Sequence, residues 1–246
     1  MRCVTLNTWK NEGDYQTRLT AMADGLAALE ADVIALQECF VAEPLGLDTA
    51  AILADRLGMH LTRRAMRAKP RLHQGAWVES RSDLAILSAV EPVSVVCNTV
   101  FVSADGDDER GLLRADIIIG GAPIRFGCTH LTHVSGIAGD TVRKAQVATA
   151  VQQLLDGWAE PAFLMGDFNA RAGDDCLSPL FAKSEREGHF RNRGGVANLI
   201  DHILLFTQDN KIRVDSQSVA MRPNAHRPEN GPSDHPAIIM DVKAYI

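Results

Sequence analysis

The stretch Ala162-Phe163-Leu164-Met165-Gly166-Asp167-Phe168-Asn169 places an acid and an amide directly after a short apolar run. A run of this length that stops at a glycine is typical of a buried strand. Asp167 and Asn169 are therefore expected at the C-terminal end of a strand. Side chains in such loops are well placed for binding or catalysis, because a rigid scaffold positions them.

Similar apolar runs, bounded by turn residues, occur from one end of the chain to the other. They predict strands over Cys3–Leu6, Val33–Leu36, Leu84–Leu87, Leu112–Ile119, Ile124–Cys128, Ala162–Met165, Leu199–Phe206 and Ala237–Val242. Strands therefore dominate the chain.

Three segments have the pattern of helices. An apolar stripe repeats at intervals of three and four residues and predicts a helix of about four turns, at Leu19, Met22, Leu26 and Leu29. A second helix is predicted over Asp48–Leu57, ended by Gly58, and a third over Thr141–Leu155, between a cap at Asp140 and a stop at Gly157. Because these helices are few and widely spaced, a layered α/β sandwich is favoured over a doubly wound parallel sheet.

Composition limits the class of protein. At 246 residues the chain is predicted to form one domain over residues 1–246, and 46% apolar with 23% charged residues is typical of a globular protein. A net charge of −6 argues against coating nucleic acid by bulk attraction, although a local basic patch is compatible with it. Five scattered cysteines fit neither a disulfide framework nor a zinc motif, and no apolar run is long enough to span a membrane. We expect a cytoplasmic protein without membrane insertion, whose oligomeric state the sequence does not indicate.

Polar side chains that could carry chemistry gather at the ends of the predicted strands. They are Asn7, Glu38, His130, Asp167, Asn169, Asp201, Asp234 and His235. Strand ends on one edge of a sandwich can converge although they are far apart in sequence. Glu38, Asp167 and Asp234 are hard oxygen donors suited to Mg²⁺. Three carboxylates held close together repel one another strongly unless a cation neutralises them, so the pattern predicts a metal site.

The imidazoles and the amide complete this chemistry. His235 is suited to act as a general base, with Asp201 fixing its tautomer. His130 and Asn169 can donate hydrogen bonds to charge that develops at a phosphorus centre.

Six short motifs follow one another along the chain: Leu6-Asn7-Thr8-Trp9, Leu36-Gln37-Glu38, Thr129-His130-Leu131, Gly166-Asp167-Phe168-Asn169, Ile200-Asp201-His202-Ile203 and Ser233-Asp234-His235-Pro236. In order and approximate spacing they resemble the endonuclease/exonuclease/phosphatase superfamily, which includes pancreatic deoxyribonuclease, apurinic endonucleases and neutral sphingomyelinases. The match spans residues 4 to 240, and six motifs in order are far more specific than one. The resemblance implies a four-layered α/β/β/α sandwich of two mainly antiparallel sheets, and metal-dependent hydrolysis of phosphoester, chiefly phosphodiester, bonds.

The resemblance also implies a role for each position. It assigns binding of the metal ion to Asn7, Glu38 and Asp234. The ion is Mg²⁺, with Mn²⁺ as the alternative. The resemblance assigns catalysis by activated water to His130, Asp167, Asn169, Asp201 and His235. Contact with the substrate phosphate is assigned to His130, Asn169 and Arg110, with Arg114 as a second candidate for the family's arginine.

Some features leave alternatives open. In the family a glycine often precedes the Ala-Ile-Leu-Ser strand, whereas Ser82-Asp83-Leu84 stand before it here, so the subfamily is not fixed. Five cations between Arg63 and Arg71 favour a solvated loop face, with a rim that attracts an anionic substrate as the alternative. Trp9 is expected either to pack in the core or to line the site.

Function has alternatives as well. A metal-binding scaffold, or a nucleic-acid or phospholipid binding module without catalysis, is the competing hypothesis. Among enzymes, a DNA endonuclease and a small-molecule or phospholipid phosphodiesterase both fit, and an aromatic content of 5% mildly disfavours the nuclease. The partner is thus a phosphoester on a small molecule, a phospholipid head group or a nucleic acid. The loops Arg63–Ala76, Lys183–Asn198 and Arg222–Ser233 are expected to decide among them.

Overall fold

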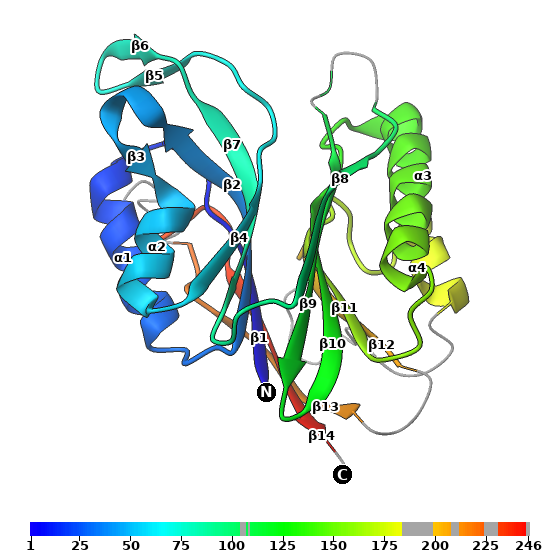
Figure 1. The fold of residues 1–246 in the computed structure, drawn as a ribbon. Coiled ribbons are helices and arrows are strands. Elements are labelled where there is room, and N and C mark those ends of the chain that lie inside the picture. Colours follow the sequence, from blue (N-terminus) through cyan, green and yellow to red (C-terminus); the bar gives the residue numbers. More distant parts are fainter. Residues whose placement is uncertain (104–106, 108, 184–198, 208–211, 224–230, 245–246) are drawn as a thin grey trace.

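Two β-sheets lie face to face in the computed structural model, which describes residues 1–103, 107, 109–183, 199–207, 212–223 and 231–244 (Figure 1). The seven-stranded sheet has the order β13 (Ile212–Ala220), β14 (Ala237–Ala244), β1 (Arg2–Asn7), β2 (Val33–Ala42), β7 (Arg81–Ser88) and β4 (His60–Arg64), with β3 (Leu47–Asp48) beside β2. The five-stranded sheet has the order β12 (Asp201–Phe206), β11 (Ala162–Asp167), β10 (Ala122–His130), β9 (Gly111–Ile119) and β8 (Ser94–Val100). A small hairpin joins β5 (Arg71–His73) to β6 (Ala76–Val78).

Helices cover the outer face of each sheet. Helices α1 (Tyr15–Ala27) and α2 (Thr49–Leu57) lie on the seven-stranded sheet, and α3 (Gly136–Leu155) and α4 (Ser178–Lys183) lie on the five-stranded sheet (Figure 1). Short 3₁₀ turns span Glu43–Leu45 and Asp175–Leu177. The expected four-layered α/β/β/α sandwich is therefore confirmed. None of the described helices combines the length and the apolar character needed to cross a membrane.

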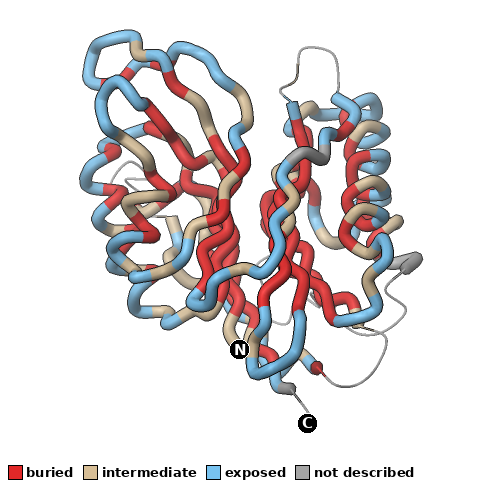
Figure 2. The backbone as a smooth tube through the Cα atoms, viewed as in Figure 1, coloured by how far each residue is buried: buried red, intermediate tan, exposed pale blue. Residues whose placement is uncertain are grey.

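Three apolar cores explain the continuous apolar runs in the sequence. In β2, Val33 and Ala35 pack between the two sheets, whereas Ile34 and Leu36 pack under α1 and α2. In β11, Phe163 lies in the core between the sheets, where its ring stacks on that of Phe126 with 5.2 Å between the ring centroids. Strands buried on both faces lose the polar alternation of a surface strand. Figure 2 shows this burial along the central strands of both sheets.

Two parallel strand pairs set the position of the strand ends. Strand β1 pairs with β2, and β10 pairs with β11, while the other strand pairs among the described residues are antiparallel. Parallel neighbours end at the same edge of a sheet. The register matches Asn7 with Gln37 and His130 with Asp167. Asn7, His130 and Asp167, the last residues of their strands, lie at one end of the sandwich, together with Glu38, which follows Gln37 inside β2.

The helices differ from the sequence predictions in detail. Helix α2 has its predicted cap, since Asp48 accepts a hydrogen bond from the Ala51 amide. The predicted start of the third helix is wrong: α3 begins at Gly136, and Asp140 lies inside it and pairs with Arg143 at 2.6 Å instead of capping the helix. The first helix ends at Ala27, before Leu29, and α3 is followed by a C-cap at Asp156.

Three strands at the sheet margins have no counterpart among the predicted strands. β4 and β13 form the edges of the seven-stranded sheet, and β8 forms an edge of the five-stranded sheet. β4 and β13 mix polar and apolar residues and lack the apolar runs on which the predictions rest, whereas β12, the other edge of the five-stranded sheet, is buried along its length and was predicted. Residues 184–198 and 224–230, within two of the predicted functional loops, lie outside the described residues.

Gly166 occupies a position that excludes a side chain. Its φ is 147°, and a Cβ built there would lie 1.9 Å from the carbonyl oxygen of Thr129 on the neighbouring strand β10. Such an overlap forces the two parallel strands apart. Because Asp167 follows directly, the close approach of β10 and β11 also sets the position of that carboxylate.

We predict that Gly166→Ala lowers the free energy of unfolding by about 3 kcal/mol or more, since the new methyl group overlaps a backbone atom and φ is unfavourable. Urea denaturation measures this. Gly173→Ala is the matched control, because a Cβ there meets no atom within 4 Å. Equal midpoints for the two variants would contradict the close packing at Gly166.

Candidate active site

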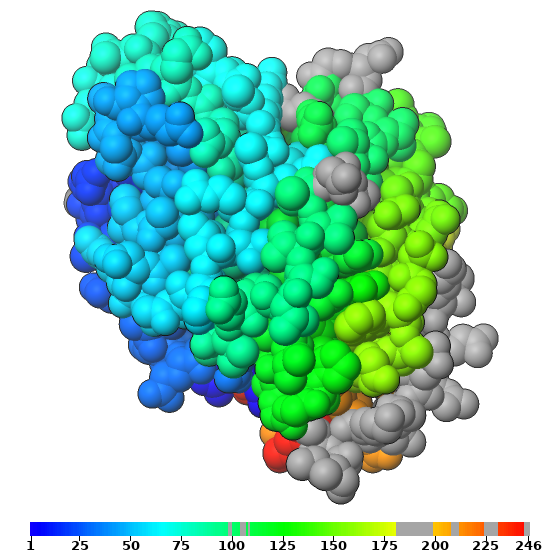
Figure 3. Space-filling model, viewed as in Figure 1, coloured from blue at the N-terminus to red at the C-terminus, as the bar shows by residue number. Residues whose placement is uncertain are grey.

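A cavity of about 390 Å³ opens at the ends of β1, β10 and β11 and beside Glu38, which lies inside β2. This end of the sandwich lies away from the two chain termini, and the space-filling surface is notched there, near β5, β6 and β8 (Figures 1 and 3). The cavity is lined by most of the predicted site residues, namely Asn7, Glu38, Arg110, His130, Asp167, Asn169, Asp234 and His235. Asp201 is not among the lining residues and lies behind His235. The two sheets thus contribute to one site.

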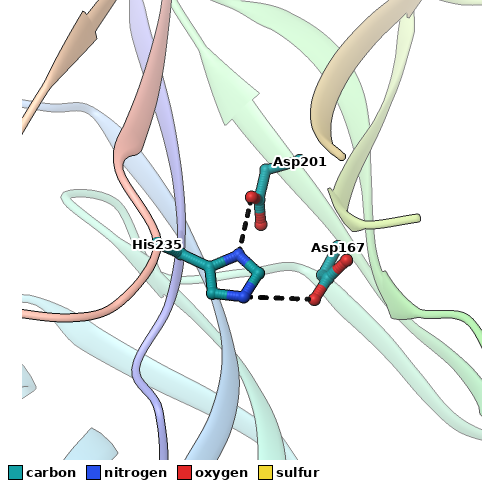
Figure 4. Close-up of side chains that lie close together, drawn as sticks. All are labelled: Asp167, Asp201 and His235. Atoms are coloured by element: carbon teal, nitrogen blue, oxygen red, sulfur yellow. Dashed lines mark hydrogen bonds and ion pairs between the residues drawn. The ribbon is translucent and has the colours of Figure 1, made fainter. Parts of the chain in front are cut away.

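His235 lies between two carboxylates (Figure 4). Its Nδ1 lies 2.7 Å from Asp201 Oδ2, and its Nε2 lies 3.9 Å from Asp167 Oδ2. A carboxylate accepts a hydrogen bond, so Nδ1 carries a proton and Nε2 faces the cavity. The loop before β14 is fixed by Ser233, whose hydroxyl donates to the Asn7 carbonyl at 2.6 Å and accepts from the His235 amide at 3.2 Å.

Burial and charge act together on the proton affinities of this group. Burial, followed by the charge of Asp201, raises the pKa of Asp167 above its ordinary value. Burial lowers the pKa of His235, but the hydrogen bond to Asp201 and the charges of Asp201, Asp167 and Asp234 outweigh it and raise that pKa to about 9. The imidazole therefore holds its second proton through neutral pH, beside a carboxylate whose own proton affinity is raised.

His130 differs from His235 in its charge. Burial, followed by the nearby charges of Arg110 and Lys10, lowers the pKa of His130 well below its ordinary value. The ring is therefore neutral at pH 7. Its Nε2 lies 3.5 Å from Asp167 Oδ2, and its Nδ1 lies 4.0 Å from Glu38 Oε1. Glu38 and Asp167 thus flank one imidazole, and together they form the acidic part of the cavity.

The two asparagines hold Asp167 from both sides. Asn7 donates its side-chain amide to Asp167 Oδ2 at 3.0 Å, across the gap between the sheets. The backbone amide of Asn169 donates to Asp167 Oδ1 at 2.8 Å, and its side-chain amide donates to the carbonyl of Leu131 at 3.0 Å. These bonds orient Asp167 before any substrate binds.

Glu38 reaches the cavity from a bulge in β2. The register between β2 and β7 shifts between Leu36 and Cys39, and Glu38 has a φ of 56°. A bulge redirects one side chain out of the regular alternation of a strand. The carboxylate meets the Lys10 ammonium at 2.7 Å. Lys10 has a positive φ as well, as do Trp9 and Asn169, and such strain is concentrated at functional sites.

The two candidate arginines have different environments. Arg110 is buried, lines the cavity and donates to Asp107 at 2.9 Å. Arg114 donates to the carbonyl of Gln153 on α3 at 2.9 Å and does not line the cavity. Of the two, only Arg110 is placed to meet a substrate in this cavity.

The basic segment between Arg63 and Arg71 is the solvated loop face that the sequence favoured only in part, since Lys69 is exposed. Arg64 and Arg71 are buried, and Arg64 pairs with Glu109 at 3.0 Å. Arg67 and Lys69 line the cavity. The segment bends over the site because Lys69 and Arg67 hydrogen-bond through their backbones to the residues that lead into β7. It therefore forms a wall of the cavity.

Arg18 on α1 is a residue that the sequence analysis missed. Its side chain is fully buried and donates to backbone carbonyls of the segment Thr8–Glu12 and of Pro232. The guanidinium also lies 4.8 Å from the ring of Trp9, which lines the cavity. Arg18 thus ties the loop after β1 to the loop that carries His235. A charged residue within the apolar stripe of α1 was the available signal.

A sequence profile of the endonuclease/exonuclease/phosphatase family matches residues 4–235. The chain belongs to this family. Members of the family are phosphoester hydrolases, generally metal-dependent, so the resemblance carried by the six motifs is confirmed. No curated protein is similar enough in sequence to count as a relative of the chain.

Solved structures of the family share the fold. An endonuclease/exonuclease/phosphatase from Beutenbergia cavernae superposes with a TM-score of 0.75 at 19% identity, over 99% of this chain and 71% of that one. The catalytic domain of human nocturnin gives 0.69 at 17% identity, over 100% and 94%. A mannosyl-6-phosphatase from Bacteroides thetaiotaomicron gives 0.63 at 16% identity, over 99% of each chain. At these identities the likeness concerns the fold alone.

We predict that Asp201→Asn lowers the pKa of His235 in the metal-free protein, because the charge that favours the imidazolium is removed. The wild-type ring keeps its second proton until the pH approaches about 9, and the variant loses that proton at lower pH. A pH titration of the imidazole resonances by NMR measures this. Asp215→Asn, at an exposed carboxylate on β13, is the control and leaves the titration unchanged. The same midpoint in all three proteins would contradict the assigned hydrogen bond.

Proposed function

We propose that this chain is a Mg²⁺-dependent hydrolase that cleaves phosphoester bonds, chiefly phosphodiesters, by attack of water activated by Asp167 and His235. The observation that carries the proposal is the convergence of groups from both sheets on one cavity. A buried acid of raised pKa, an imidazole held by a second acid, and a carboxylate beside a cation meet there. Each of these groups has a separate use in displacement at phosphorus.

Proton transfer is assigned to Asp167 and His235. Asp167 orients the attacking water and accepts its proton, which a carboxylate of raised pKa does more readily than an ordinary one. His235, whose pKa is raised to about 9, carries an N–H at Nε2 that lies 3.9 Å from Asp167, while Asp201 holds Nδ1 and fixes the ring. Both groups line the cavity in which the phosphorus centre is proposed to dock.

Stabilisation of the negative charge on the phosphate is assigned to three hydrogen-bond donors. His130, neutral because its pKa is lowered, donates an N–H to a phosphate oxygen. Arg110 presents a guanidinium whose orientation is fixed by Asp107. Asn169 lies next to Asp167 and contacts the scissile phosphate from the same side.

The residues present fit a hard divalent cation. The Glu38 carboxylate already forms an ion pair with the Lys10 ammonium, at 2.7 Å. Glu38 would hold Mg²⁺ or Mn²⁺ directly, with the amide oxygen of Asn7 and the carboxylate of Asp234 beside it. When bound, the ion would act as a Lewis acid on a phosphate oxygen.

Another group of potential ligands has a different use in this proposal. Asp167, Asp201 and His235 also offer ligand atoms within 4.8 Å of one another. The short hydrogen bond between Asp201 and His235 Nδ1 already occupies that nitrogen. We therefore assign this group to proton transfer and keep the metal at Glu38.

The size of the cavity supports a small phosphoester. About 390 Å³ is in the range of pockets that enclose drug-sized molecules. A metabolite or a phospholipid head group fits this volume, whereas a long nucleic acid needs an extended groove. We keep the cytoplasm as the proposed location.

We expect the wild-type protein with Mg²⁺ to hydrolyse bis-p-nitrophenyl phosphate, and EDTA to abolish the reaction. His235→Ala should reduce turnover by roughly 10²–10⁴-fold, the usual contribution of a positioned acid or base. His60→Ala, at an exposed histidine on β4, is the matched control. Release of p-nitrophenolate measures the rate, and circular dichroism checks that both variants fold.

Two results would contradict the proposal. Near-normal hydrolysis by His235→Ala would refute the role of that residue. No chelator-sensitive product from a panel of phosphodiesters, phosphomonoesters and plasmid DNA would favour the alternative, a metal-binding scaffold without catalysis.

A further inference from the structure

His133 lines the cavity, although the proposed chemistry gives it no role. Its side chain is 65% exposed and is bonded to Arg110, which in turn is bonded to Asp107. Arg110 Nη2 lies 2.9 Å from His133 Nδ1 and 2.9 Å from Asp107 Oδ1. The side chain of Asp107 is 0% exposed. The three side chains therefore form a series of hydrogen bonds that leads from the interior to the cavity.

The backbone on both sides of His133 is fixed by helix α3. The Thr132 amide donates to Gln146 Oε1 at 2.9 Å. The Arg143 guanidinium donates to the carbonyls of Thr132 and Val134, at 2.7 and 3.0 Å. Arg143 and Gln146 are both buried. His133 therefore projects from a rigid part of the cavity wall.

The hydrogen bond to Arg110 determines which ring nitrogen of His133 carries the proton. A guanidinium has N–H donors and no acceptor, so His133 Nδ1 accepts this bond and is unprotonated. Asp107 Oδ1 lies farther from Nδ1, at 3.4 Å. The ring proton is therefore on Nε2. Since Nε2 makes no hydrogen bond with any described residue, its N–H is left for a bound molecule.

Arg110 keeps a second side for the phosphate. Its Nη2 is bonded to Asp107 and His133, whereas its Nη1 makes no hydrogen bond with a described residue. Burial raises the pKa of Asp107, but the hydrogen bonds from Arg110 and Thr132 outweigh it and lower that pKa below its ordinary value. The carboxylate thus stays charged and fixes the guanidinium. A phosphate bonded to Nη1 would lie next to the His133 ring.

The strand order places His133 on the side of the cavity away from the attacking water. Four strands of the five-stranded sheet follow one another in the order β12, β11, β10 and β9. The water belongs to the first two, where Asp167 ends β11 and His235 contacts Asp201 of β12. Arg110 directly precedes β9 and brings His133 to that side. In displacement at phosphorus the attacking and leaving oxygens lie roughly in line, so the leaving oxygen is directed toward β9.

We propose that His133 is a catalytic residue whose Nε2–H donates a hydrogen bond to the leaving oxygen of the scissile ester. This inference rests on the proposed function and deepens it. Water forms a bond to phosphorus and gives its proton to Asp167, and the bond to the leaving oxygen breaks with its electron pair on that oxygen. His133 stabilises this negative charge and keeps its own proton. The released oxyanion takes a proton from solvent.

This role predicts that His133 matters most for a poor leaving group. Methyl p-nitrophenyl phosphate and methyl phenyl phosphate differ in the leaving group alone. The nitro group spreads the charge of the departing oxyanion, whereas phenolate keeps it on oxygen and depends more on a donor. With Mg²⁺ present, His133→Ala should lower kcat for the phenyl ester by roughly 10²-fold, and for the nitrophenyl ester by about threefold or less. KM should stay within about twofold, because the bond strengthens only in the transition state.

Two further variants separate this role from a structural one. His133→Gln, whose side-chain amide offers an N–H near the place of Nε2, should restore part of the rate for the phenyl ester. His60→Ala, at an exposed histidine on β4, is the matched control and should leave both rates unchanged. If the wild type is active and His133→Ala loses nothing, or loses equally on both esters, the role of His133 is overturned while the proposed function stands. A wild type that hydrolyses neither ester, nor any ester of the panel above, would overturn both.

The tautomer gives a readout that needs no turnover. We expect ¹⁵N NMR of the resting protein to place the proton of the uncharged His133 ring on Nε2, with the resonance assigned by its loss in His133→Gln. A proton on Nδ1 would leave no donor toward the cavity, and would overturn the inference without bearing on the proposed function.

Discussion

Apolar packing between the two sheets is the constraint on which the site depends. The facing surfaces are filled by residues such as Phe126, Phe163 and Ile86, which are fully buried. This packing brings the ends of β1 and β2 against the ends of β10 and β11. Asn7 can then donate to Asp167, and His235 can meet Asp201, although each pair comes from different sheets. No single sheet contains a complete set of reacting groups.

The same packing determines the chemistry of those groups. Exclusion of water raises the pKa of Asp167 and lowers that of His130. The charges of His235 and Glu38 are stabilised by ion pairs: His235 pairs with Asp201, and Glu38 pairs with Lys10. A carboxylate of raised proton affinity and a neutral imidazole donor follow from burial, and both suit water attack on a phosphoester.

Much of this arrangement was predictable from the sequence, for a physical reason. Central strands buried on both faces give unbroken apolar runs, and polar residues that follow such runs, for example Asp167 after Met165, mark the strand ends. The edge strand β13 carries a mixed sequence and was missed. The bulge that turns Glu38 into the cavity, and the position of Arg67 and Lys69 at the cavity, depend on tertiary packing, which a local pattern does not encode.

The central claim is that Glu38 holds a divalent cation within reach of the Asp167 and His235 pair. The most direct test is a crystal of the protein soaked with Mn²⁺ and inorganic phosphate, with the ion located by its anomalous scattering. The account predicts an anomalous peak bonded to the Glu38 carboxylate, Lys10 displaced from it, and a phosphate oxygen on the same ion. A peak bonded instead to Asp201 and His235, or none in the cavity, would contradict it.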